Sequence, residues 1–307
     1  MKVIVIGATG HIGSYLVPRL LNLGYEVVAV TRGQSSGYCE PSVWDKVQRV
    51  QIDRQALEAQ GTFGPAIAGL VGDIVIDLIC FTQASAQHLV EALEGKVSHF
   101  LHCGTIWVHG GTKLVPSLES QTRYPICQYG RDKASAESYL LTQANLKTFP
   151  VTVIHPGHIV GPRWTSLNPQ GNFNPQVFED IKQGKEIILP NLGKETLHHV
   201  HADDVALLFI QAIRHRDKAL GQSFHAVSDQ ALTLNRYVQE VSQHYGFTAR
   251  IRHISLEAMQ NHLSSEDYMA TVEHLNHSSN CSNAKAKSLL DYAPKYSSVT
   301  AILESLP

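Results

Sequence analysis

The sequence predicts an α/β fold in which helices cover both faces of a doubly wound parallel sheet, with a smaller C-terminal lobe. The chain opens with the apolar run of residues 3–6, which is typical of a strand buried on both faces. A glycine-rich turn follows directly, and a helical pattern comes next. Further strand-like runs recur at the intervals of such a sheet, at residues 26–30, 47–52, 74–80, 100–103 and 151–154.

Length and composition exclude several classes of protein. The chain has 307 residues, of which 43% are hydrophobic and 17% charged, and its length suggests two domains or one domain with an added lobe. A formal charge of −2 argues against a nucleic-acid partner, which would need a strongly basic surface. No apolar stretch approaches the roughly 20 residues that a bilayer requires, so we expect no membrane partner. The start lacks a secretory pattern and the five cysteines form no C-x-x-C pair, so we expect a cytoplasmic protein.

The glycine turn places Gly7, Gly10 and Gly13 between the first strand and the first helix. Gly7 and Gly10 allow a tight turn and a close approach to a pyrophosphate, and Gly13 allows the helix to pack against the sheet. The N-terminus of the helix offers free N–H groups to phosphates. Between a buried strand and a helix, this turn predicts a dinucleotide-binding site rather than a simple connection.

The end of the second predicted strand bears on the choice of dinucleotide. An NAD-binding site usually has an acidic residue about 20 positions beyond the glycine motif, where it binds the ribose 2′-OH. Thr31 stands there with Arg32 beside it, so we predict NADP as the preferred cofactor and NAD as the alternative. Asp53 and Arg54 follow the third strand, where Asp53 could accept from the adenine amino group or serve as an ordinary turn residue.

Thr105, Tyr129 and Lys133 are the candidate catalytic residues. Thr105 follows the fifth predicted strand, at the carboxyl edge where ligands of open α/β sheets bind. Tyr129 and Lys133 are four residues apart at the start of a predicted helix, so their side chains share one face. Nearby positive charge lowers the pKa of a phenol from about 10, so Lys133 and a nicotinamide would bring Tyr129 closer to neutrality. Thr105 would then bind the substrate oxygen while Tyr129 exchanges its proton.

Five stretches of the chain resemble the extended short-chain dehydrogenase/reductase family, the NAD(P)-dependent epimerases and dehydratases. They are residues 7–13, 100–110, 129–133, 155–162 and 201–206. The resemblance implies a Rossmann-like fold, with Thr105 positioning the substrate oxygen, Tyr129 as the acid/base and Lys133 also holding the nicotinamide ribose. Two residues depart from the family pattern: His109 replaces a usual Tyr, and His155 stands where Arg is usual.

The resemblance and the glycine turn together predict the cofactor site and the division of the chain. We expect a dinucleotide-binding domain at residues 1–162, to which residues 196–227 return. Residues 163–195 and 228–307 would form the substrate-binding lobe. The residues expected to contact the cofactor are Gly7, Thr9, Gly10, His11, Ile12, Gly13, Arg32, Asp53, Arg54, Phe81, Cys103, Tyr129, Lys133, Pro156 and His158.

Seventeen histidines raise the question of a metal site. His199 and His201 would share one face of a strand, but no carboxylate or thiol completes a ligand spacing, so we predict no metal and interpret the histidines as satisfied structural residues. The lobe carries six aromatic or amide residues that we expect to lie mostly in its core. They are Trp164, Phe173, Asn174, Tyr237, Tyr245 and Tyr268.

The leading hypothesis is an NAD(P)-dependent oxidoreductase that moves a hydride between nicotinamide and a secondary alcohol or ketone. One alternative is a nucleotide-sugar epimerase or dehydratase that retains NAD. The sequence lacks an expected diphosphate-binding Arg near residues 194–198, which argues against that alternative, although Arg163 or Lys194 could serve instead. Another alternative is a non-catalytic dinucleotide sensor or RNA-associated protein on the same fold. We expect a small-molecule partner, and the family resemblance is compatible with a homodimer.

Overall fold

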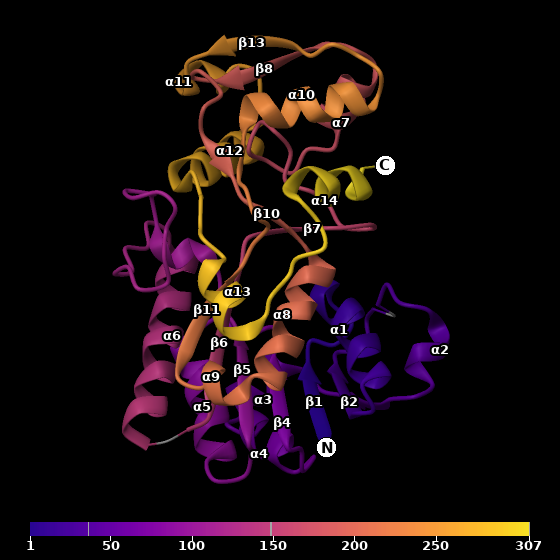
Figure 1. Ribbon diagram of the computed structural model, residues 1–307, viewed down its shortest axis with the longest axis vertical. Coiled ribbons are helices and arrows are strands. Elements are labelled where there is room, and N and C mark those ends of the chain that lie inside the picture. The colour runs from indigo at the N-terminus through magenta and orange to yellow at the C-terminus, as the bar shows by residue number, and fades with distance from the viewer. Residues whose placement is uncertain (36, 148, 307) are drawn as a thin grey trace.

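A seven-stranded parallel sheet forms the centre of the computed structural model, which describes residues 1–35, 37–147 and 149–306 (Figure 1). Its strand order is β11-β6-β5-β4-β1-β2-β3, and every pairing between neighbours is parallel. This order confirms the predicted fold class. The strands are β1 Lys2–Ile6, β2 Glu26–Thr31, β3 Gln48–Gln51, β4 Ile74–Asp77, β5 His99–Cys103, β6 Val151–Pro156 and β11 Gln222–Ala226.

The strands bury apolar side chains on both faces of the sheet. In β1, Val3 and Val5 join one core cluster while Ile4 and Ile6 join another, because alternate side chains of a strand point to opposite faces. The first cluster is covered by α1 His11–Asn22, α8 Ala202–Arg214 and α13 Ala284–Leu290. The second is covered by α4 Phe63–Ala68, α5 Gln83–Leu93 and α6 Gln128–Lys147. The result is a three-layer arrangement.

Short elements complete the sheet domain and connect it to the lobe. The helices are α2 Pro41–Trp44, α3 Arg54–Ala59, α9 Arg216–Ala219 and the 3-10 turn η1 Ile106–His109. The strand β10 His199–His201 pairs with β7 His158–Val160 at the carboxyl edge of the sheet. The expected helix start at residues 201–206 is confirmed, since the His201 side chain accepts a hydrogen bond from Asp203 N and caps α8.

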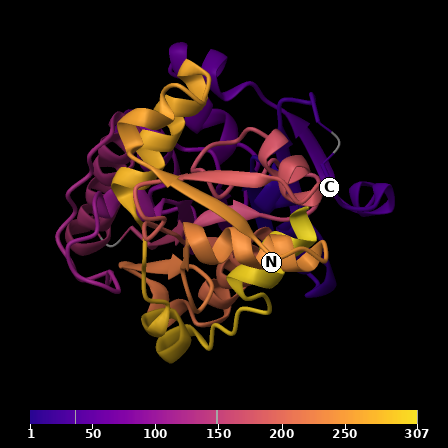
Figure 2. The same cartoon turned by 90° about the horizontal axis from the view of Figure 1, so that it is seen from above.

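The lobe stands on the carboxyl edge of the sheet, at the end opposite the N-terminus (Figure 1), and lies in front of the sheet domain when seen from above (Figure 2). Its core includes Phe178, Leu189 and Tyr237. Its elements are α7 Gln176–Lys182, β8 Glu186–Pro190, β9 Thr196–Leu197, β12 Leu232–Thr233, α10 Leu234–His244, β13 Arg250–Ile254, α11 Leu256–Met259, α12 Ser265–His277 and α14 Ser298–Ser305.

One helix that we predicted in the lobe, α13, packs on the sheet domain. Ala286, Leu290 and Tyr292 belong to the sheet-domain cluster with α1 and α8, so α13 covers the sheet instead of the lobe. The chain therefore returns to the sheet domain a second time within residues 228–307. None of the helices in the described residues combines the length and apolar character that a bilayer-spanning segment needs.

Candidate active site

The glycine turn has the geometry of a phosphate cradle. Gly7 has a φ of +86°, and a Cβ there would lie 2.8 Å from the Ile79 side chain. A Cβ on Gly13 would lie 2.2 Å from the carbonyl oxygen of Ala8, so the first turn of α1 can pack this closely only with glycine. No side chain in the described residues caps α1 at Gly10, which leaves its first amides available to an anion. The turn therefore fits the pyrophosphate of a dinucleotide.

A cleft of about 280 Å³ runs from this turn to the end of β2. Gly7, Thr9 and Gly10 line one end, and Thr31 and Arg32 line the other. Ile12 is buried in the sheet-domain core, so any contact it makes with a cofactor would come from its backbone.

Asp53 and Arg54 have structural partners at the far side of this cleft. Asp53 caps α3 by accepting a hydrogen bond from Ala56 N at 3.1 Å, which corresponds to the turn alternative raised for it. The Arg54 guanidinium donates to both carboxylate oxygens of Asp77, at 2.8 and 2.9 Å, and to Glu58 at 2.7 Å. Arg54 lines the cleft, but these two carboxylates already balance its charge.

Lys133 is buried beneath the cleft, at 2% exposure. Its Nζ donates to the carbonyl oxygens of Cys80 and Cys103 at 2.6 and 2.8 Å, so the segment after β4 and the end of β5 hold the ammonium group. The same Nζ lies 4.8 Å from the centre of the half-exposed Phe81 ring. Because an ammonium has three N–H donors and two are used here, one remains for a ligand.

The pKa of Tyr129 in the protein without a cofactor is set mainly by desolvation. Lys133 Nζ lies 5.9 Å from the centre of the Tyr129 ring, and its hydrogen bonds go to the two carbonyls. Burial beside Phe81 and Trp107 raises the pKa of Tyr129 to about 12, and only the hydrogen-bonding Thr105 hydroxyl opposes it. The predicted lowering needs the nicotinamide as well as Lys133, so it stays a prediction for the cofactor-bound protein, in which the added positive charge must outweigh this desolvation.

Thr105 is held by a network of buried charges. Its hydroxyl accepts from Trp107 N at 3.3 Å and caps η1, and His155 Nδ1 lies 3.0 Å from its backbone nitrogen and 2.8 Å from its carbonyl oxygen. The other nitrogen of His155 lies 2.9 Å from Glu137 Oε1, and Arg123 binds the same carboxylate at 2.7 Å. Burial opposes ionisation of Glu137, but His155 and Arg123 outweigh it and hold its pKa well below the usual range. His155, which replaces the family's Arg, thus supports the Thr105 backbone.

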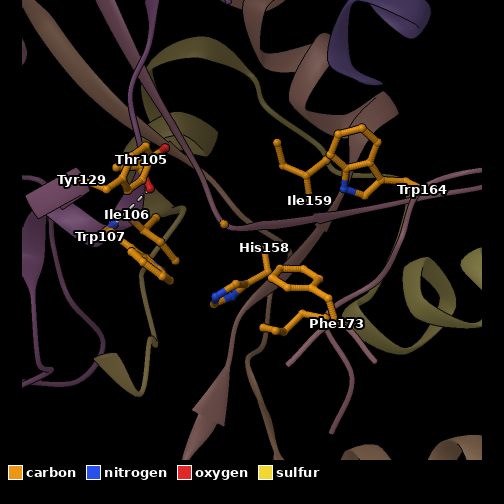
Figure 3. Close-up of a pocket in the computed structure, with 10 residues that line it drawn as sticks. Thr105, Ile106, Trp107, Tyr129, His158, Ile159, Trp164 and Phe173 are labelled. Carbon is orange, nitrogen blue, oxygen red and sulfur yellow. Dashed lines mark hydrogen bonds between the residues drawn. The ribbon is translucent and has the colours of Figure 1, made fainter. Parts of the chain in front are cut away.

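A second cavity, of about 240 Å³, adjoins these residues (Figure 3). Thr105 and Tyr129 lie side by side on one wall, and Trp164 stands on the opposite wall. His158 points into the cavity near Phe173, and burial lowers its pKa well below 6.5, so the imidazole is neutral. Pro156 ends β6 just before this wall and is buried. The remaining lining residues are Ile106, Trp107, Gly157, Ile159 and Leu167.

The structure brings into the site aromatic residues that we expected in the lobe core. Trp164 and Phe173 are 42% and 46% exposed and line the cavity, whereas Tyr237 is fully buried as predicted. Trp164 lines both the cavity and the glycine-turn cleft, and its ring stacks on His11 at 4.7 Å. The signal for Trp164 was its position directly after the family-like segment of residues 155–162.

The histidines are less well satisfied than we expected. His102 is fully buried in β5, yet neither of its ring nitrogens has a hydrogen-bond partner in the described part of the chain. His201, in contrast, has a structural function as the cap of α8. The interpretation of all the histidines as satisfied residues was therefore wrong for His102.

The chain matches the family described as "NAD dependent epimerase/dehydratase family" over residues 3–63 and 77–225. Three curated relatives are 23–28% identical to this chain over the aligned residues. A protein named chloroplast stem-loop binding protein of 41 kDa b, from Arabidopsis thaliana, is 24% identical over 80% of this chain and 64% of its own length. UDP-glucose 4-epimerase of Mycolicibacterium smegmatis is 28% identical over 69% of this chain and 73% of its own. 2′-Dehydrokanamycin reductase of Streptomyces kanamyceticus is 23% identical over 80% of this chain and 67% of its own.

Solved structures agree on the fold. UDP-glucose 4-epimerase from Thermotoga maritima, in a crystal structure with UDP-glucose, superimposes with a TM-score of 0.75 at 20% identity. The match covers 100% of this chain and 97% of that one. At this identity the likeness concerns the arrangement of helices and strands, since one fold hosts many functions.

Proposed function

Because the chain belongs to the NAD-dependent epimerase/dehydratase family, we propose that it is an NADP(H)-preferring oxidoreductase that interconverts a secondary alcohol and a ketone. One observation carries the proposal. Thr105 and Tyr129 share a wall of a cavity that Trp164 joins to the glycine-turn cleft. A reacting carbon held there would lie between a proton donor and the expected site of the nicotinamide.

The side chains have separate tasks in this reaction. A bound nicotinamide would supply or accept the hydride and, when oxidised, would add positive charge near the phenol. Tyr129 gives a proton to the carbonyl oxygen during reduction and takes it back during oxidation. Thr105 holds the same oxygen through its hydroxyl. Lys133 offers its remaining N–H to the ribose and keeps a positive charge below the site.

The preference for NADP rests on the charges around the end of β2. Arg32 lines the glycine-turn cleft, and Arg49 lines the cavity next to it. No carboxylate is among the described residues that line either space, so a ribose 2′-phosphate would meet no like charge. An Arg guanidinium binds phosphate well because its N–H groups match the phosphate oxygens.

The substrate cavity favours a small, uncharged molecule with an apolar body. Its ten lining residues include two Trp, one Phe and three aliphatic side chains, with no Lys, Arg, Asp or Glu. Its volume of about 240 Å³ is below the roughly 300–1,000 Å³ of sites for drug-sized ligands. A nucleotide sugar carries a diphosphate, for which this wall has no cationic partner.

The test is NADPH consumption with a set of small aromatic and aliphatic ketones. We expect turnover with NADPH to exceed turnover with NADH, and Tyr129→Phe to reduce kcat by about 100- to 10,000-fold with NADPH binding nearly unchanged. Tyr139→Phe, on the same helix, is the matched control and should keep full activity. Wild-type activity in Tyr129→Phe would refute the proposal. Tightly held, non-exchanging NAD with no net NADPH consumption would instead identify an epimerase or dehydratase.

The similarity to a stem-loop-binding protein favours a second candidate function, binding of a structured nucleic acid. A protein that neutralises phosphates with Lys and Arg loses affinity steeply as salt rises. We would therefore measure binding of an RNA hairpin at low and physiological salt, with and without NADPH. Absence of salt-sensitive binding would reject this second function.

A further inference from the structure

We propose that His109, His225 and Cys281 form a binding site for one divalent transition-metal ion, and that their chemistry favours Zn²⁺. The three side chains come from the end of η1, from β11 and from the segment after α12. One donor atom of each lies within 4.8 Å of the other two, and all three residues are buried. The site is separate from the catalytic residues of the proposed function and does not depend on that function.

The two imidazoles already direct the required nitrogens toward each other. The Nε2 atoms of His109 and His225 lie 2.8 Å apart, with the ring planes at 80°. His225 Nδ1 lies 2.9 Å from the carbonyl oxygen of Ser282, which can only accept, so Nδ1 carries the proton and Nε2 keeps its lone pair. A backbone partner of this kind on the outer nitrogen is the usual way of orienting a metal-binding imidazole.

Cys281 supplies the third donor. Its backbone N–H donates to His198 Nδ1 at 3.0 Å, which fixes the position of the residue behind the two imidazoles. Donor atoms around a tetrahedral zinc ion lie roughly 3.3–3.7 Å apart. The two nitrogens would therefore separate by about half an ångström and the sulfur would approach by up to about one. Side-chain rotations can supply movements of this size.

Binding must release one proton, because Cys281 coordinates as a thiolate. The neutral His109 imidazole keeps its single proton by moving it from Nε2 to Nδ1, which has no partner among the described residues, so one Zn²⁺ would displace only the thiol proton. Neutral imidazole with thiolate suits zinc, whereas calcium and magnesium prefer oxygen ligands. The buried Glu119 carboxylate accepts from the His225 backbone N–H at 3.0 Å, which fixes the part of β11 that carries this imidazole.

A cavity of about 330 Å³ gives the site a path to solvent. His109 lines this cavity together with Ser117 and Thr122. A bound ion would connect η1 to the chain that leaves α12, where His277 stacks on Trp107 at 4.1 Å. The ion would therefore stabilise the turn that carries Trp107 into the substrate cavity.

The test uses the full chain, stripped with a chelator, reconstituted with Zn²⁺ or Co²⁺ alone and passed through gel filtration. We expect about one equivalent of metal per chain, and Co²⁺ should show a thiolate charge-transfer band with tetrahedral d–d absorption. Cys281→Ser should abolish the charge-transfer band and reduce bound zinc at least tenfold. Cys127→Ser is the matched control, because Cys127 faces another imidazole, that of His277, at 3.9 Å.

X-ray absorption on the wild-type zinc protein makes the test independent of whether the variants fold. One sulfur at about 2.3 Å and two imidazole nitrogens at about 2.0 Å are expected around the ion. Less than about 0.1 equivalent of metal after reconstitution, a coordination shell without sulfur, or loss of the charge-transfer band in Cys127→Ser alone would each overturn the proposal.

Discussion

Acidification should unfold this protein through its buried histidines. Five of them are 5% exposed or less, and burial lowers the pKa from 6.5 to about 4 or about 3 in every case. They are His11, His99, His198, His199 and His201. Each is neutral when folded but takes up a proton in the unfolded chain below pH 6.5. The stability they contribute is therefore complete above that pH and is lost as the pH falls toward their folded values.

The size of the effect follows from these shifts. Between about pH 7 and pH 5, each histidine removes roughly 2 kcal/mol, so the five remove roughly 9 kcal/mol. Asp204 acts in the opposite direction. Burial raises its pKa to about 6, so between about pH 7 and pH 5 the folded protein takes up a proton there and the free energy of unfolding rises by about 1 kcal/mol. The net loss is comparable to the whole free energy of unfolding of a typical domain, about 5–15 kcal/mol.

The assay is urea unfolding followed by circular dichroism at about pH 7, 6 and 5 and constant ionic strength. We expect the urea midpoint to fall steeply, with little folded protein left near pH 5. In His99→Gln, the difference between pH 7 and pH 5 should shrink by roughly 2 kcal/mol, whatever the stability of the variant at pH 7. The exposed His262→Gln is the control and should leave the difference unchanged. A wild-type loss below about 2 kcal/mol would refute the reasoning.

Three substitutions test the site and its support. Glu137→Gln leaves buried positive charge without its carboxylate, so we expect a loss of about 3–5 kcal/mol in urea unfolding. Gly13→Ala places a methyl group 2.2 Å from a backbone oxygen, and NADPH binding measured by fluorescence should weaken at least tenfold. Trp164→Ala removes the ring that lines both cavities, so KM should rise several-fold for coenzyme and substrate together.

Matched control variants distinguish these effects from a non-specific loss of folding. Gly69→Ala introduces only ordinary contacts and should keep NADPH affinity, and Phe247→Ala removes an exposed ring of the lobe and should keep both KM values. The exposed Glu91→Gln should cost less than about 1 kcal/mol. A Gly13→Ala affinity within threefold of wild type, or a Trp164→Ala effect on one KM only, would contradict the predictions.

Local sequence patterns were sufficient to predict the fold, because the spacing of apolar residues follows from which faces of each strand and helix are buried. The apolar run before Gly7 marked a strand covered on both faces, and its side chains do divide between two cores. The spacing of Tyr129 and Lys133 correctly put both on the face of α6 that meets the sheet edge. The place of His201 before two Asp residues likewise marked a helix start.

The sequence by itself determined the parallel sheet, the phosphate turn and the order of the candidate catalytic residues, since each depends on neighbours within a few positions. Only the tertiary structure decided which groups each of these side chains contacts. It directed the ammonium of Lys133 to two backbone carbonyls, placed Trp164 at the glycine-turn cleft and brought together His109, His225 and Cys281. Such groupings join residues that are 30 or more positions apart in the sequence, and the desolvation that sets their proton affinities exists only once the chain has packed around them.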